Sequence, residues 1–179
     1  MKTIVESIRI LIVFTLLTGV IYPLLVTGVG KALFPKQAHG SLVMHDGKIT
    51  GSELLAQKFD DPRYFSPRPS GADFATVASG ASNKGPTSAD LVKAIAERRT
   101  KFGNDAPGDL LTASGSGLDP HISPAAARFQ VPRVAAERKV QPEKISALVE
   151  KHIEPPQFGF LGEARVNVFA LNRALDALR

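Results

Sequence analysis

An uninterrupted apolar run near the amino terminus constrains this chain more than any other feature. Residues 10–30 contain no charged side chain and are rich in Leu, Ile, Val and Phe. As an α-helix rising about 1.5 Å per residue, the run is about 31 Å long, which matches the roughly 30 Å hydrocarbon core of a bilayer. We therefore expect a transmembrane helix over residues 10–33, with Pro23 as a kink inside it.

A cleaved signal peptide is the alternative interpretation of the same run. Lys2 and Arg9 provide a basic start, and Gly28 and Gly30 are small enough for a cleavage site. The apolar segment of a signal peptide is usually only about 7 to 15 residues long. The length of the run therefore favours a retained anchor.

The flanking charges say less about orientation, because basic residues stand at both ends of the run. Long domains cross a membrane largely regardless of charge, and a short basic tail usually stays inside. We expect residues 1–9 in the cytoplasm and residues 36–179 outside it.

Residues 36–179 suffice for one domain, because no internal repeat or low-complexity linker divides them and 44% of the whole chain is apolar. Asp46-Gly47 separates two short β-prone runs within residues 41–50, the strongest short hairpin signal. The predicted fold class is α+β: one N-terminal transmembrane helix, then a single helix-rich extracytoplasmic domain with a short hairpin.

Helix signals recur along this domain. Ser52 precedes a short helical pattern as a candidate N-cap, and Thr87 stands three residues before Asp90 in a variant capping box that starts a helix ending at Gly103. In that helix the expected inward residues are Leu91, Ile95 and Phe102, and the expected outward ones are Glu97, Arg98, Arg99 and Lys101.

The carboxyl-terminal third predicts three more helices. Ser123-Pro124 opens one that Pro132 is expected to interrupt or kink, and Pro142 begins the next. Residues 165–179 combine a short apolar strand with an amphipathic helix.

Composition excludes several classes of protein. The chain has no cysteine, which removes disulfides, thiol nucleophiles and zinc sites built on Cys pairs. The net charge is +5, but the basic residues are scattered and Trp is absent, so a nucleic-acid surface has little support. Mild basicity is more simply explained by contact with anionic lipid or an acidic partner.

The stretch GASNKGPT, residues 80–87, approaches the phosphate-binding pattern G-x-x-x-x-G-K-[ST]. Pro86 stands where the lysine belongs and supplies neither positive charge nor an N–H group, while Lys84 is displaced by two positions. We interpret the stretch as a turn and helix start, capped by Thr87, instead of a nucleotide site.

A second stretch, residues 112–127, places Ser114, Ser116, Asp119 and His121 close together, which suggests a membrane-tethered hydrolase using Ser116 and His121. The nucleophile-elbow pattern fails, however, and one short loop cannot align all three members of a triad. A Gly/Ser turn with an Asp-Pro bend is the simpler explanation, and a polar docking surface for a protein partner lies between the two.

Metal binding and exposed aromatic anchoring receive little support from the spacing. The four histidines are dispersed without a paired motif, and the aspartates lack the alternation of a calcium loop. Tyr64-Phe65 stands beside Arg63 and Arg68, and we expect this pair to close the core.

Taken together, several stretches in order resemble one family over essentially the whole chain. After the apolar run come YFSPRPS (64–70), SGASNKGPT (79–87), TASGSGLDPHISPAAA (112–127), RVAAERK (133–139) and GFLGEARVNVFALN (159–172). These resemble the C subunit of the bacterial potassium-transporting Kdp ATPase.

The resemblance implies a single-span accessory subunit of a bacterial inner-membrane complex, not an enzyme itself. Its implied partners are a channel-like potassium-binding subunit, a P-type ATPase catalytic subunit, a small single-helix subunit and membrane lipid, with no nucleic acid. ATP and potassium are handled by the complex, and no cofactor is assigned to this chain.

The family is described as needed for assembly and as a catalytic chaperone that raises the ATP affinity of the pump subunit. An external domain cannot touch cytoplasmic ATP, so such an effect has to be indirect or the topology has to differ. The resemblance implies no catalytic or metal residue, and its candidates for loop packing or docking are Tyr64, Phe65, Arg68, Ser82, Asn83, Ser114, Ser116, Asp119 and His121.

Overall fold

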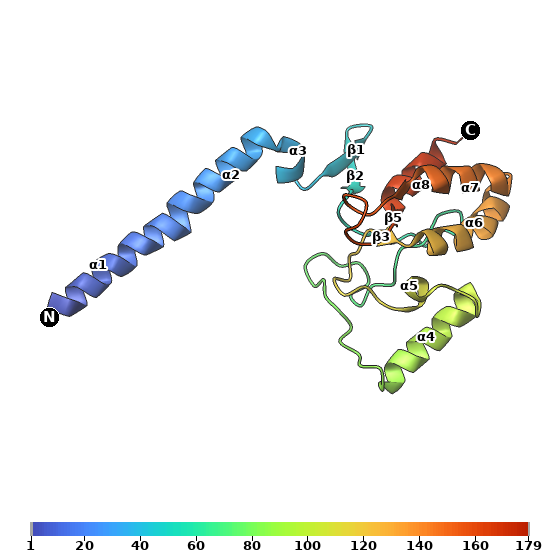
Figure 1. The fold of residues 1–179 in the computed structure, drawn as a ribbon, viewed down its shortest axis with the longest axis horizontal. Coiled ribbons are helices and arrows are strands. Elements are labelled where there is room, and N and C mark those ends of the chain that lie inside the picture. The colour runs from blue at the N-terminus through green and yellow to red at the C-terminus, as the bar shows by residue number, and fades with distance from the viewer. Residues whose placement is uncertain (1, 179) are drawn as a thin grey trace. The chain divides into compact units, whose positions relative to one another are not determined.

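The computed structural model describes residues 2–178. The chain divides into two compact units, Met1–Ile49 and Thr50–Arg179, and each is described by itself (Figure 1).

The first unit is dominated by one long helix, made of α1 (Lys2–Leu16), a π-helical turn η1 (Leu17–Ile21) and α2 (Tyr22–Leu33). Within Lys2–Leu33 no side chain is buried by other parts of the protein, and this is the helix whose length and composition suit a membrane crossing. The π-turn ends two residues before Pro23. A wider turn accommodates a proline that lacks the N–H of a regular helix.

The remainder of the first unit is short. Helix α3 (Pro35–Ala38) is followed by β1 (Leu42–His45), which pairs with β2 (Lys48–Ser52), a strand that continues past Ile49, the last residue of this unit. Asp46 and Gly47 connect these strands with φ angles of 49° and 75°, the positive values that a two-residue hairpin turn requires. The hairpin predicted from Asp46-Gly47 is confirmed.

A three-stranded antiparallel sheet and three helices form the core of the second unit. Strand β5 (Arg165–Asn167) lies between β3 (His121–Ile122) and β4 (Ile153–Glu154), and Val166 is the partner of both Ile122 and Ile153. Helices α6 (Pro124–Arg138), α7 (Pro142–Lys151) and α8 (Val168–Asp176) pack together beside the sheet (Figure 1). The helix-rich α+β prediction is confirmed.

These helices begin where the sequence indicates. The Ser123 hydroxyl accepts a hydrogen bond from the Ala126 N–H, and the Asn167 side chain caps α8 through the Ala170 N–H, both at 3.0 Å. Pro142 opens α7 as expected. Of the two outcomes expected at Pro132, the interruption is wrong, because α6 continues to Arg138 and the buried neighbours of Pro132 hold the helix together, while the kink stays a prediction.

Helix α4 (Ala89–Phe102) differs from its expected form at its start and on one face. The N-cap is Ser88, not Thr87, and its side chain makes no capping bond, so the predicted capping box is wrong by one residue. Arg98 is not outward: its guanidinium donates to the Leu111 carbonyl at 2.6 Å, at the end of α5 (Gly108–Leu111). Gly103 ends α4 as predicted.

The short helix predicted after Ser52 does not form. Ser52 ends β2, and its hydroxyl accepts the Leu54 N–H at 3.1 Å in a local turn. A Ser side chain that bonds two residues ahead makes a turn in place of a helix cap.

Two buried amide side chains position the extended segment that follows. Asn172 on α8 accepts the Phe65 N–H at 2.9 Å and donates to the Phe65 carbonyl at 3.0 Å. Gln130 on α6 accepts the Ser66 N–H at 2.8 Å and donates to the Ser66 carbonyl at 3.2 Å. We call these four bonds the amide clamp.

The amide clamp carries Phe65 into the core, where its ring is fully buried, as predicted. Arg133 supports the same segment by donating to the Tyr64 carbonyl at 3.1 Å and to the Gln130 oxygen at 2.7 Å. Because burial disfavours its charged form, the pKa of Arg133 is lowered from its ordinary value.

Replacing Asn172 by Ala is expected to leave the Phe65 N–H and carbonyl buried without partners. Each such group costs about 1 to 3 kcal/mol, so we expect a loss of about 3 kcal/mol of unfolding free energy. Urea unfolding of the full-length protein in detergent micelles measures it. The exposed Asn104→Ala is the matched control, and an equal loss in both variants would contradict the clamp's importance.

Candidate functional site

Three loops from distant parts of the sequence meet in the second unit, and we call residues 64–71, 79–83 and 112–123 together the loop cluster. The Ser114 N–H donates to the Pro69 carbonyl at 2.9 Å. A Cβ added at Gly117 would lie 2.8 Å from the Gly80 carbonyl oxygen, and one at Gly71 would lie 3.2 Å from the same atom. The backbones approach this closely only because glycine has no side chain.

The two serines of the third loop use their hydroxyls on the backbone around them. Ser114 Oγ lies 3.1 Å from Ser116 Oγ and accepts the Gly117 N–H at 3.0 Å. Ser116 Oγ accepts the Leu118 N–H at 3.1 Å. Both hydroxyls therefore stabilise a tight turn, as Ser side chains commonly do.

This geometry gives the hydrolase alternative no support. Ser114 is buried, and within residues 2–178 no hydrogen bond joins Ser116 to His121. The His121 ring instead has Asp119 beside it, with Nδ1 at 3.6 Å from Oδ1. A nucleophile needs its base within about 2.6 to 3.2 Å.

Asp119 joins the first and third loops electrostatically. Its carboxylate lies 3.2 Å from Arg68 Nη1 and accepts the His121 backbone N–H at 3.0 Å. Burial alone would raise the pKa of Asp119, but the bonds from His121 and Arg68 together outweigh it, so the pKa is below its ordinary value. Asp119 is therefore ionised at neutral pH and holds Arg68 in place.

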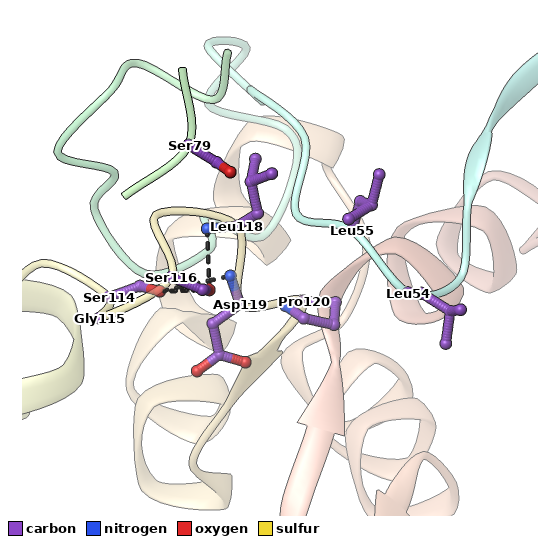
Figure 2. Close-up of a pocket in the computed structure, with 9 residues that line it drawn as sticks. All are labelled: Leu54, Leu55, Ser79, Ser114, Gly115, Ser116, Leu118, Asp119 and Pro120. Carbon is purple, nitrogen blue, oxygen red and sulfur yellow. Dashed lines mark hydrogen bonds between the residues drawn. The ribbon is translucent and has the colours of Figure 1, made fainter. Parts of the chain in front are cut away.

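Two open depressions flank Asp119. The first, about 440 Å³, is lined by Leu54, Leu55 and Ser79 together with residues 114–116 and 118–120, and Figure 2 shows the Asp119 carboxylate pointing away from Ser79 and Leu118. The second, 350 Å³, exposes that carboxylate together with Arg68, His121 and Glu163. Within residues 2–178, both depressions included, no group of three or more His, Cys, Asp or Glu side chains is placed so that it could hold a metal ion.

The sequence-derived candidates therefore have different surroundings. Phe65 and Ser114 are interior, whereas Ser82 and Asn83 are exposed at the rim of the loop cluster. Arg68, Asp119 and His121 are half-buried. Tyr64 is also half-buried: its hydroxyl donates to Asp176 at 3.1 Å, and the Arg138 guanidinium lies 4.8 Å from its ring centre.

The phosphate-loop candidate, residues 80–87, contains no helix or strand and is exposed from residue 81 to residue 87, and α4 begins only at Ala89. No strand precedes them between residues 53 and 79, all of which the structure describes. A phosphate loop connects a strand directly to a helix, so this segment has a different architecture.

An exposed aromatic turn at residues 157–161 was not among the features predicted from the sequence. Gln157 and Leu161 exchange backbone hydrogen bonds at 2.9 Å, and this turn leaves Phe158 and Phe160 82% and 77% exposed. The closely spaced Gly159 and Gly162 are the sequence signal for this turn, and both have a positive φ in the structure. Two large apolar side chains exposed in one short turn are typical of a contact surface.

Comparison with known proteins identifies what the chain is similar to. The family described as K+-transporting ATPase, c chain, matches residues 4–177. A protein of Methylococcus capsulatus named potassium-transporting ATPase KdpC subunit is 53% identical, over 97% of this chain and 96% of the relative. A Geobacter metallireducens protein of the same name is 48% identical over 99% of each chain.

Gly117→Ala is expected to destabilise the loop cluster. The new Cβ would overlap the Gly80 carbonyl, and Gly117 has a φ of 73°, which costs a side-chain-bearing residue about 1 kcal/mol or more. We expect a loss of about 2 to 3 kcal/mol in urea unfolding. Gly115→Ala, with open space around it, is the control; equal stability of the two variants would contradict the close approach.

Asp119→Asn is expected to lower stability by about 1 kcal/mol at neutral pH, because charge-assisted bonds are stronger than neutral ones. A carboxylate with a depressed folded-state pKa stabilises the protein above its unfolded pKa of about 3.9, and the benefit is lost as pH falls through the folded value. The wild-type advantage should therefore be constant from about pH 5 to 7, begin to fall near about pH 4, and vanish only below the folded-state pKa. Urea midpoints across this range test it, with exposed Asp105→Asn as control; an advantage that persists in acid would refute the assignment.

Proposed function

The chain belongs to the KdpC family, the c chain of K+-transporting ATPases, and on this premise we propose that it serves as the non-catalytic accessory subunit of an ATP-driven potassium-uptake complex. The observation that carries the proposal is the family match over residues 4–177. An accessory role in potassium transport follows from it directly.

The proposed topology is single-pass in a bacterial inner membrane. Residues 10–33 cross the bilayer, residues 1–9 stay in the cytoplasm, and residues 36–179 form an extracytoplasmic domain. The long exposed apolar helix supports the crossing, because a soluble protein rarely leaves so large an apolar surface uncovered.

ATP hydrolysis and ion selection are proposed to belong to other chains: the P-type ATPase subunit, and the channel-like potassium-binding subunit with its small single-helix companion. The bonding in the loop cluster supports this division, since Ser114 and Ser116 bond to backbone N–H groups. Their hydroxyls hold a loop in shape, and a chain with this role needs no reaction centre of its own.

The domain is proposed to dock as a cap on the channel-like subunit. Ser82 and Asn83 at the rim of the loop cluster, and the rings of Phe158 and Phe160, are the exposed groups available for contact. The loop cluster behind these exposed groups is held in shape by Arg68, Ser116, Asp119 and His121. A chaperone effect on ATP affinity would then pass through the assembled complex, because the domain and the nucleotide lie on opposite sides of the membrane.

Alkaline phosphatase fused after Arg179 is expected to be active in intact cells, and green fluorescent protein at the same position dark. The reverse pattern would place the domain in the cytoplasm and remove the objection to direct contact with ATP.

The affinity-tagged full chain, extracted in mild detergent, is expected to bring the other subunits of the potassium-transporting ATPase with it. The same purification from cells lacking those subunits is the control. Recovery of the tagged chain alone would refute the accessory-subunit proposal.

A further inference from the structure

The hydrogen-bond ladder of the long helix has a gap in the middle of the apolar run. The Tyr22 N–H bonds the Leu17 carbonyl, five residues back, and not the Thr18 carbonyl four residues back. The next residue, Pro23, has no N–H to donate. The Thr18 carbonyl is therefore left without a main-chain donor.

Side chains of the described residues do not fill this gap. The Thr18 hydroxyl is turned the other way and donates to the Phe14 carbonyl at 2.6 Å. No side-chain bond to the Thr18 carbonyl occurs within residues 2–178. The acceptor is thus open to a donor from outside the chain.

The location of this carbonyl makes a donor necessary. Thr18 lies near the middle of residues 10–30, so in the proposed transmembrane helix it is at the depth where water is absent. An unsatisfied backbone group in hydrocarbon costs several kcal/mol, and neighbouring helices are the usual source of the missing bond.

The helix surface beside the gap allows close approach. Gly19 has no side chain, and a Cβ built there would have nothing within 4 Å. Small residues at such a position let two helix backbones come together, so that side chains can reach across.

We propose that the Thr18–Pro23 turn is the docking point for a transmembrane helix of another subunit, one that brings a hydroxyl or amide donor of Ser, Thr, Asn or Gln to the Thr18 carbonyl. This inference rests on the proposed function, which makes residues 10–33 the membrane anchor.

A second copy of the chain is a poorer occupant. Two copies with the same topology run parallel, so Thr18 faces Thr18, whose hydroxyl is already engaged with Phe14. The other donor side chains of residues 10–30, Thr15, Tyr22 and Thr27, are displaced along the axis by about 4.5, 6 and 13.5 Å. A donor at the right depth has to come from a different sequence.

Three variants of the tagged full chain test this docking point. Each is expressed with the complete set of pump subunits, so that a loss of partner binding can be told apart from a failure of the helix to form. Gly19→Leu blocks close approach, and Pro23→Ala returns an N–H to the ladder. Gly28→Leu is the matched control, because nine residues further on it lies on a largely different face and is equally open. Each variant is first checked in the membrane fraction, and co-purified subunits are then quantified.

Gly19→Leu and Pro23→Ala should each retain about 5- to 30-fold less of the partner subunits, the range expected for one interhelical hydrogen bond and its packing, while Gly28→Leu retains wild-type amounts. If all three retain wild-type amounts, or all three lose them equally, the docking point is refuted while the accessory function stands. A wild-type chain that brings no pump subunits refutes the proposed function instead.

Gly19→Cys identifies the neighbour, because it creates the only cysteine in the chain. Cross-linking to another pump subunit supports the docking point, and cross-linking between two copies overturns it.

Discussion

The amide clamp is the contact on which the rest of the second unit depends. Residues 64–66 belong to no helix or strand, so their backbone groups require partners from elsewhere once they are buried. Asn172 and Gln130 supply those partners in the reciprocal pattern of a β-ladder. With this segment fixed between α6 and α8, Phe65 completes the core, and the loops that follow start from a defined position.

How much of this was predictable depends on the range of the interaction that decides each element. Asp46-Gly47, Ser123-Pro124 and Gly103 act within a few residues, and their turn, helix start and helix end are as predicted. Ser52 and Thr87 are equally good candidates for a helix N-cap. In the structure, however, Ser52 ends strand β2, and Ser88 is the N-cap of α4. Pro132 shows the same limit, because buried neighbours hold α6 together across a residue that would break an isolated helix.

The loops of the candidate site could be predicted from the sequence one by one, but the contacts between them could not. The sequence marks the serines, Asp119 and His121 as neighbours, yet it cannot show that Gly117 rests on Gly80 or that Arg68 reaches Asp119. The amide clamp is the hardest part to predict, because Asn172 and Gln130 appear in the sequence only as polar side chains among the apolar positions of a helix. The ionic and hydroxyl groups that suggest catalysis in the sequence are used in the fold to hold loops together.

The hydrogen bond from Ser114 to Pro69 closes the base of a long excursion of the chain. The chain between these two residues reaches the core again at Leu110, which is fully buried, but α4 has no buried residue among positions 89–102. Such a segment opens at a lower free energy than the core to which it is tied. A change in length or a cut within α4 is therefore expected to disturb the three packed helices less than one elsewhere in the domain.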